Sequence, residues 1–139
     1  MQKALLHGGH RFEVRVVQAC VQGNHVHLLV EAPDQIALGR AMKGLAVRIA
    51  RGLNRMMHMG GRVLGDRYHA RPLRSPSAVR SVMHYIRHNH QHHGLSHAVI
   101  DEYSSDALLS GILPPATLWV LTVGWQRGRV GKLPEEVAT

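Results

Sequence analysis

Along residues 11–31, mainly apolar side chains alternate with more polar ones on either side of a Gly23-Asn24 dipeptide. Such alternation is typical of a β-strand with one buried face, because successive side chains of a strand point to opposite faces of the sheet. A Gly-Asn pair between two such runs indicates a turn. The sequence therefore predicts a β-hairpin over residues 11–31.

The second strand of this hairpin begins with two histidines. Period two places His25 and His27 on one face and Val26, Leu28 and Val30 on the other. Two imidazoles at one spot are able to bind a divalent metal ion. Strand histidines are, however, often simply exposed, and the pattern alone leaves both interpretations open.

Two amphipathic helices are expected after the hairpin. Asp34 is an N-cap residue, and apolar residues recur at helical spacing until Gly60-Gly61, where the first helix should end. Ser75-Pro76 combines a cap with a proline in the first turn of a second helix, which should run until Gly94. Residues 117–125 form a further small helix or strand, whose type the pattern does not decide.

The segment between these helices, residues 63–73, looks extended. In that conformation two sets of side chains lie on opposite faces, namely Arg67, His69 and Arg71 against Tyr68 and Ala70.

The amino-acid composition indicates what kind of molecule the chain binds. The 139 residues suit a single domain, and 17 Lys and Arg against 9 Asp and Glu favour a polyanion such as nucleic acid. The lone cysteine, Cys20, cannot form an intramolecular disulfide and suits a reducing compartment. Neither a signal peptide nor a membrane span is recognised, so we expect a cytoplasmic protein.

The predicted second helix carries Tyr85 and Asn89, which the i to i+4 spacing places on one helix face. A tyrosine in such a helix is more often a packing residue than a nucleophile. Several histidines lie between His84 and His93, and they form either a metal site or a solvated helix end.

The predicted first helix carries a basic stripe opposite much of its apolar face. Its members are Arg40, Lys43, Arg48, Arg51 and Arg55. Such a stripe is either a solvated face or a surface for phosphates, and the basic charge of the whole chain gives both interpretations equal weight.

In combination these elements are more specific. The octapeptide Gly23–Val30, a basic helix, the segment 61–71 and Tyr85 with Asn89 follow one another in this order. This order resembles the HUH single-tyrosine transposases, and most closely their REP-associated branch. The resemblance covers about residues 12–94 and continues weakly through 119–125.

The resemblance implies a mechanism. His25, His27 and Asn89 would hold a divalent metal, Mg²⁺ or Mn²⁺, and Tyr85 would attack single-stranded DNA to form a 5′-phosphotyrosine. The DNA partner would be a strand that forms a hairpin. Besides the basic stripe, the DNA-binding residues would include Arg67 and Arg71.

The resemblance also implies an α+β fold, with a ferredoxin-like antiparallel sheet that carries two helices on one face. Only residues 1–10 precede the hairpin, so the first strand of that fold is expected to be missing. A misassigned start codon, a decayed copy of the element or strand exchange in a homodimer would each account for this. The resemblance further implies a bacterial, nucleoid-associated protein. We expect one domain over 1–139, with a core of about 11–94 and a C-terminal extension over 95–139.

Two other functions compete with the nicking and joining of DNA. A catalytically silent DNA-binding protein would suit the short N-terminus, but the complete set of two histidines, tyrosine and asparagine argues against it. A histidine-rich metal-binding protein would use the run from His84 to His93.

Overall fold

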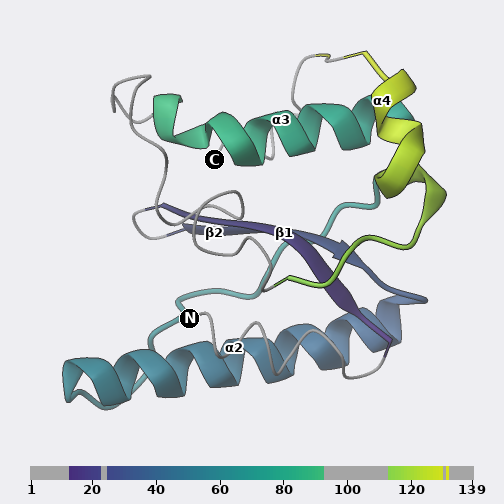
Figure 1. The fold of residues 1–139 in the computed structure, drawn as a ribbon. Helices are drawn as coiled ribbons and strands as arrows, with labels where there is room; N and C mark the ends of the chain where they lie inside the picture. Colours follow the sequence, from purple (N-terminus) through teal and green to yellow (C-terminus); the bar gives the residue numbers. More distant parts are fainter. Residues whose placement is uncertain (1–12, 23–24, 93–112, 130, 132–139) are drawn as a thin grey trace. The chain divides into compact units, whose positions relative to one another are not determined.

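The computed structural model describes residues 13–22, 25–92, 113–129 and 131. Its fold is α+β, as predicted (Figure 1). The elements in chain order are β1 (Arg15–Gln22), β2 (His25–Glu31), α2 (Gln35–Met57), α3 (Pro76–His92), the π-helical turn η1 (Val120–Gly124) and α4 (Trp125–Arg127).

The chain divides into two compact units. The helical unit contains α2 and the segment after it, within residues 32–71, together with the described residues up to Arg15. The hairpin unit contains residues 16–31 and the described residues from Pro72 onward, and therefore holds both strands, α3, η1 and α4.

The predicted hairpin is confirmed, because β1 and β2 pair as a two-stranded antiparallel sheet. Its second strand begins at His25, as expected. The first strand begins at Arg15 and not at residue 11, because Glu13 has a left-handed φ of 60° that interrupts the extended backbone. The Gly23-Asn24 turn lies outside the described residues.

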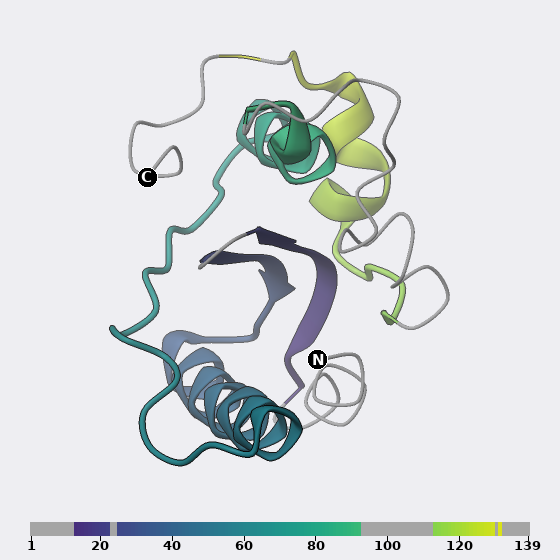
Figure 2. The same cartoon turned by 90° about the vertical axis from the view of Figure 1, so that its left-hand side faces the viewer.

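Helix α3 packs on β2, and the view along its axis shows it over the hairpin (Figure 2). The helix begins as predicted, since the amide of Ala78 donates to the Ser75 hydroxyl at 3.2 Å and Pro76 occupies the first turn. It extends to His92, and the expected end at Gly94 lies outside the described residues. The buried cluster beneath it consists of Cys20, Leu29, Val79, Val82, Tyr85, Ile86 and Leu121.

The element of undecided type at 117–125 is helical. In η1 the amide of Trp125 donates to the carbonyl of Val120, five residues earlier, which is the hydrogen bond of a π turn. After α4, the chain runs against the beginning of α3, where the amides of Arg129 and Gly131 donate to the hydroxyls of Ser77 and Ser81. This C-terminal segment is therefore part of the hairpin unit.

Glu31 joins the end of β2 to the C-terminal segment. Its side chain is 4 % exposed, and its carboxylate accepts the amide and the hydroxyl of Thr117 at 2.7 and 2.8 Å and the amide of Leu118 at 2.8 Å. Hydrogen bonds to a charged acceptor are stronger than neutral ones. This contact thus fixes the turn that precedes η1.

Replacing Glu31 by Gln should therefore lower the free energy of unfolding by about 2 kcal/mol, because a neutral amide oxygen accepts the two backbone amides more weakly than a carboxylate and the Thr117 hydroxyl would have to change from donor to acceptor. Urea denaturation measures this change. The matched control is Glu13→Gln, since Glu13 is exposed. A loss within about 0.5 kcal/mol of that of the control would show that the Glu31 contact does not stabilise the fold.

In the helical unit, Asp34 caps α2 as predicted, and its Oδ1 accepts the amide of Ala37 at 2.7 Å. The helix ends at Met57, three residues before the expected Gly60-Gly61. It ends early because His58 adopts the left-handed conformation with φ 51°, and its amide donates to the carbonyl of Asn54. A glycine was expected in this role, but histidine is a residue type that tolerates it.

The segment after α2 turns back along the helix. The side-chain amide of Asn54 donates to the Gly61 carbonyl at 2.9 Å. Farther along the segment, the Tyr68 hydroxyl lies so close to the helix that a Cβ on Gly39 would be 3.6 Å from it. No strand forms over residues 63–73, and all side chains of residues 67–71 are exposed. The extended backbone and its division into two faces stay predictions, since exposure of all five side chains does not test them.

Among the described residues, no helix has the length and apolar character needed to cross a membrane. The ferredoxin-like arrangement, with helices on one face and its first strand missing, stays a prediction, because residues 1–12 lie outside the described part of the chain.

Candidate active site

Three aromatic side chains of the hairpin unit meet between β2 and α3. The ring centroids of His25 and His27 are 6.3 Å apart, with the planes tilted by 33°. His27 in turn makes an edge-to-face contact with Tyr85, at a centroid distance of 5.3 Å. The structure thus brings together the two predicted metal ligands and the predicted nucleophile.

Local structure explains this meeting. The period of β2 places His25, His27 and Leu29 on the same face of the strand, and Leu29 belongs to the cluster that also contains Tyr85. On α3, Val82 and Ile86 lie one turn before and one residue after Tyr85, and both are buried in that cluster. Apolar packing on both elements therefore directs the histidines and the tyrosine toward each other.

Burial increases from one ring to the next. His25 is exposed, His27 is half-buried, and Tyr85 is only 8 % exposed. Tyr85 is therefore a core residue as well as the neighbour of a candidate metal ligand. The packing role that the sequence left open is confirmed.

The side chains present fit a metal site in part. Two imidazoles on one strand face suit Mn²⁺ or Zn²⁺ by donor type. Over the described residues, however, no group of three or more His, Cys, Asp and Glu side chains could hold a metal ion. A third protein ligand must therefore be of another type or lie beyond these residues. Asn89, in α3 one turn after Tyr85, stays the predicted ligand, and its side chain is outside the described part.

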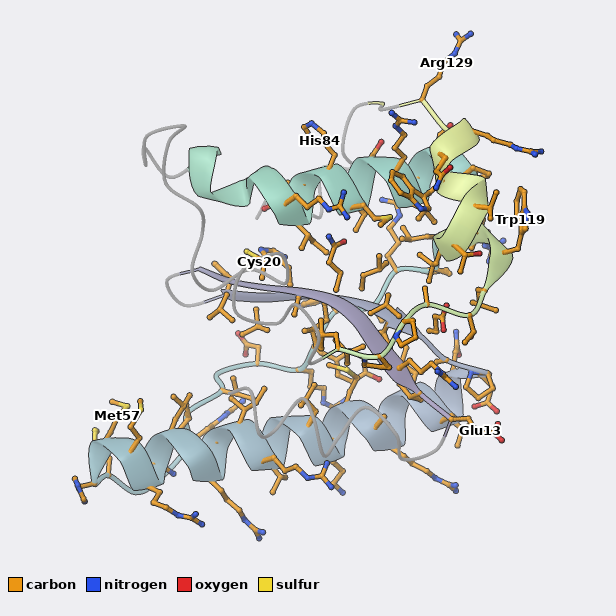
Figure 3. The ribbon with its side chains drawn as sticks, viewed as in Figure 1. Glu13, Cys20, Met57, His84, Trp119 and Arg129 are labelled. Atoms are coloured by element: carbon orange, nitrogen blue, oxygen red, sulfur yellow. The ribbon has the colours of Figure 1, made fainter. Side chains whose placement is uncertain are left out.

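Gln18 is a buried polar residue of β1 that the sequence did not single out. It is 4 % exposed, and its Oε1 accepts no hydrogen bond from the part of the chain that the structure describes. By period two, Gln18 shares a face of β1 with Cys20, a member of the Tyr85 cluster, and Figure 3 shows Cys20 between the hairpin and α3. An amide at an apolar position of the alternating pattern was the available signal. A buried acceptor without a donor is uncommon and often marks a site that binds something else.

The basic stripe lies on α2, in the helical unit. This 23-residue helix contains five basic residues and no acidic residue. Arg40, Lys43, Arg51 and Arg55 are exposed and Arg48 is half-buried. Arg67 and Arg71, in the segment after the helix, are exposed too.

The other candidates for nucleophile and metal ligand are Tyr68, Tyr103 and the histidines from His84 onward. Tyr68 belongs to the helical unit and is 46 % exposed, whereas Tyr103 lies outside the described residues. His84 is exposed on α3 and points away from the hairpin (Figure 3). From His88 onward, the side chains of the histidine run are outside the described part, so their role stays open.

Comparison with known families identifies one that matches most of the described chain. The sequence profile of the family described as "Transposase IS200 like" matches residues 2–89, more than half of the chain. The matched range includes His25, His27, Tyr85 and Asn89. No curated protein and no solved structure matches the chain significantly.

Proposed function

The chain belongs to the IS200-like transposase family, and on this premise we propose that it nicks and rejoins single-stranded DNA through Tyr85. Membership of the family makes the chain a DNA-processing enzyme. The observation that carries the finer proposal is the contact of 5.3 Å between the rings of His27 and Tyr85. This contact puts a hydroxyl-bearing ring beside the histidine pair. We also propose that the chain belongs to the REP-associated branch.

In the proposed reaction the Tyr85 hydroxyl gives up its proton and its oxygen attacks a DNA phosphorus. The bond between phosphorus and the 3′ oxygen breaks, and that oxygen takes a proton to become a free 3′-hydroxyl. The product is a 5′-phosphotyrosine. Because the phosphodiester is exchanged and not hydrolysed, a second 3′-hydroxyl can reverse the step and join a new strand.

His25, His27 and Asn89 would hold the divalent ion on which the family generally depends, and Mg²⁺ or Mn²⁺ would be used. When bound, the ion acts as a Lewis acid on the scissile phosphate. The three ligands carry no negative charge, so they leave the charge of the ion available to the phosphate. Tyr85 and Asn89 lie one turn apart on α3, so one helix would set the separation of nucleophile and ligand.

The burial of Tyr85 favours a second candidate, a DNA-binding protein of the same family without catalysis. A ring that is 8 % exposed fills the core whether or not its hydroxyl reacts. In that case the basic helix would still bind DNA, and the histidines would lie beside a tyrosine that never meets a phosphate.

Covalent trapping separates these two functions. The protein is incubated with a library of single-stranded hairpin oligonucleotides and Mn²⁺, and the products are separated under denaturing conditions. A nicking and joining enzyme gives a protein band shifted by attached DNA. A silent DNA-binding protein retains the oligonucleotides under native conditions but gives no such band.

We propose further that the stripe of α2 binds DNA phosphates. A helix with five basic and no acidic residues has no charge within itself to neutralise the stripe. The exposure of four of these side chains makes them accessible to a polyanion.

Replacing Arg51 by Ala should weaken the affinity for single-stranded DNA about evenly across sequences, and it should reduce the slope of log K against log salt by about 0.7, the value for one phosphate contact. Fluorescence anisotropy at several salt concentrations measures this slope. The matched control is Arg62→Ala, because the Arg62 Nε donates to the Leu64 carbonyl at 2.8 Å. If both variants keep the original slope, the stripe is only a solvated face.

A further inference from the structure

The C-terminal segment carries an exposed tryptophan that the proposed chemistry does not use. Trp119 immediately precedes η1 and is 55 % exposed, and its ring projects outward from this segment in Figure 3. The exposed side chain of Arg127 lies over the ring, with its guanidinium carbon 6.0 Å from the centroid. Ring and cation together offer a flat, positively charged surface to solvent.

A glycine makes room for this ring. A Cβ on Gly124 would lie 2.6 Å from the nearest atom of the Trp119 ring, which is closer than any contact allows. The ring therefore lies over the one position of η1 that has no side chain. The hydrogen bond of a π turn spans five residues, so residues 119 and 124 lie about one turn apart.

The backbone on both sides of Trp119 is fixed. Before it, Thr117 and Leu118 are bound by the buried carboxylate of Glu31. After it, Trp125 packs against the core cluster, and the guanidinium groups of Arg80 and Arg87 lie 6.0 and 5.8 Å from its ring. One tryptophan thus anchors the segment, and the other is held exposed on a rigid base.

We propose that Trp119 and Arg127 form a stacking platform for an unpaired base of single-stranded DNA, separate from the site at Tyr85. Exposed aromatic rings beside arginines bind single strands of any sequence, because every base has a π face and every nucleotide a phosphate. The inference rests on the proposed function for its choice of DNA as the partner.

The charge around the platform favours a nucleic acid over a protein partner. Residues 113–131 contain two basic residues, Arg127 and Arg129, and no Asp or Glu. Helix α3, which lies beside them, also carries no acidic residue. The neighbouring Val123 is 43 % exposed, so it adds apolar surface beside the ring.

The test compares two fluorescent strands of roughly 16 nucleotides, one of thymidines and one with the same phosphates but abasic tetrahydrofuran units. Affinities are measured by anisotropy without metal, so that no covalent step takes part. Trp119→Ala should weaken binding of the thymidine strand roughly 5- to 150-fold, as expected for the loss of one stacked base. Binding of the abasic strand should not change. Trp119→Phe, which keeps a ring, should restore part of the affinity.

Two further variants sharpen the test. Gly124→Ala should weaken thymidine binding even though Trp119 is present, because the added methyl group displaces its ring. Leu118→Ala, at an equally exposed neighbour, should leave the affinity unchanged. Thermal melting checks that every variant is folded.

Unchanged affinity of Trp119→Ala for the thymidine strand would overturn the inference, and so would an equal loss for both strands. If affinity is unchanged but self-association is lost in sedimentation, the platform is a protein interface and the inference is wrong. Repeating the comparison in Tyr85→Phe separates the two proposals. The Trp119 effect on binding should persist in that background. If the protein that retains Tyr85 forms no adduct with hairpin DNA while the Trp119 effect is present, this supports the platform and contradicts only the chemistry.

Discussion

Tyr85→Phe should form no covalent adduct with single-stranded hairpin DNA, while it still binds DNA and Mn²⁺. The variant lacks only the oxygen that would attack phosphorus. Its phenyl ring keeps the packing against Val82 and Ile86 and the edge-to-face contact with His27. We therefore expect the free energy of unfolding to fall by no more than about 1.5 kcal/mol, the cost of one lost hydrogen bond. Denaturing electrophoresis with labelled DNA measures the adduct.

The matched control is Tyr68→Phe, which removes a hydroxyl from the helical unit and should retain adduct formation. Proteolysis of the trapped complex identifies the modified peptide independently. Recovery of the DNA on Tyr68 or Tyr103 would show that the nucleophile is misassigned. An adduct on the Tyr85→Phe protein would lead to the same conclusion.

The sequence predicts the elements around the site well, because their signals are local. Two-residue alternation indicates β1 and β2, and side-chain caps at Asp34 and Ser75 mark where α2 and α3 begin. Each of these signals depends on neighbours within four residues. The positions of His25 and His27 at the beginning of β2 follow from the same pattern.

Other features depend on contacts that no local pattern contains. The end of α2 is set by His58, whose left-handed backbone carries out a task that usually falls to glycine. The exposure of the segment around Tyr68 depends on which elements pack against it, which the alternation of its side chains does not reveal. Glu31 reads as the last polar residue of β2, although it binds backbone amides at 117 and 118, more than 80 residues later.

The candidate site depends both on local sequence patterns and on contacts between distant segments. Spacing alone places His25 beside His27, and helical periodicity places Tyr85 on the apolar face of α3. Their meeting across two elements came from a family resemblance and not from spacing, because the sequence separation is about 60 residues. The buried oxygen of Gln18 could not be foreseen as unpaired, since that property depends on every neighbour in the folded chain.

His25→Ala and His27→Ala should each reduce Mn²⁺-dependent cleavage by roughly 100-fold or more, since Lewis-acid stabilisation of the phosphate is a matter of several kcal/mol. His25 is the cleaner position, because its side chain is exposed and its removal leaves the packing of Tyr85 intact. His27→Ala also removes the ring that contacts Tyr85. Cleavage assays and calorimetric titration with Mn²⁺ measure the two effects.

The matched control is His84→Ala, because His84 is exposed on α3 and points away from the hairpin (Figure 3). It should retain both cleavage and Mn²⁺ affinity, whereas the two strand variants lose them together. If His25→Ala and His27→Ala cleave like the original protein, the pair does not hold the ion. Loss of cleavage with unchanged Mn²⁺ affinity would instead make His27 a group that positions Tyr85 through the contact between the two rings.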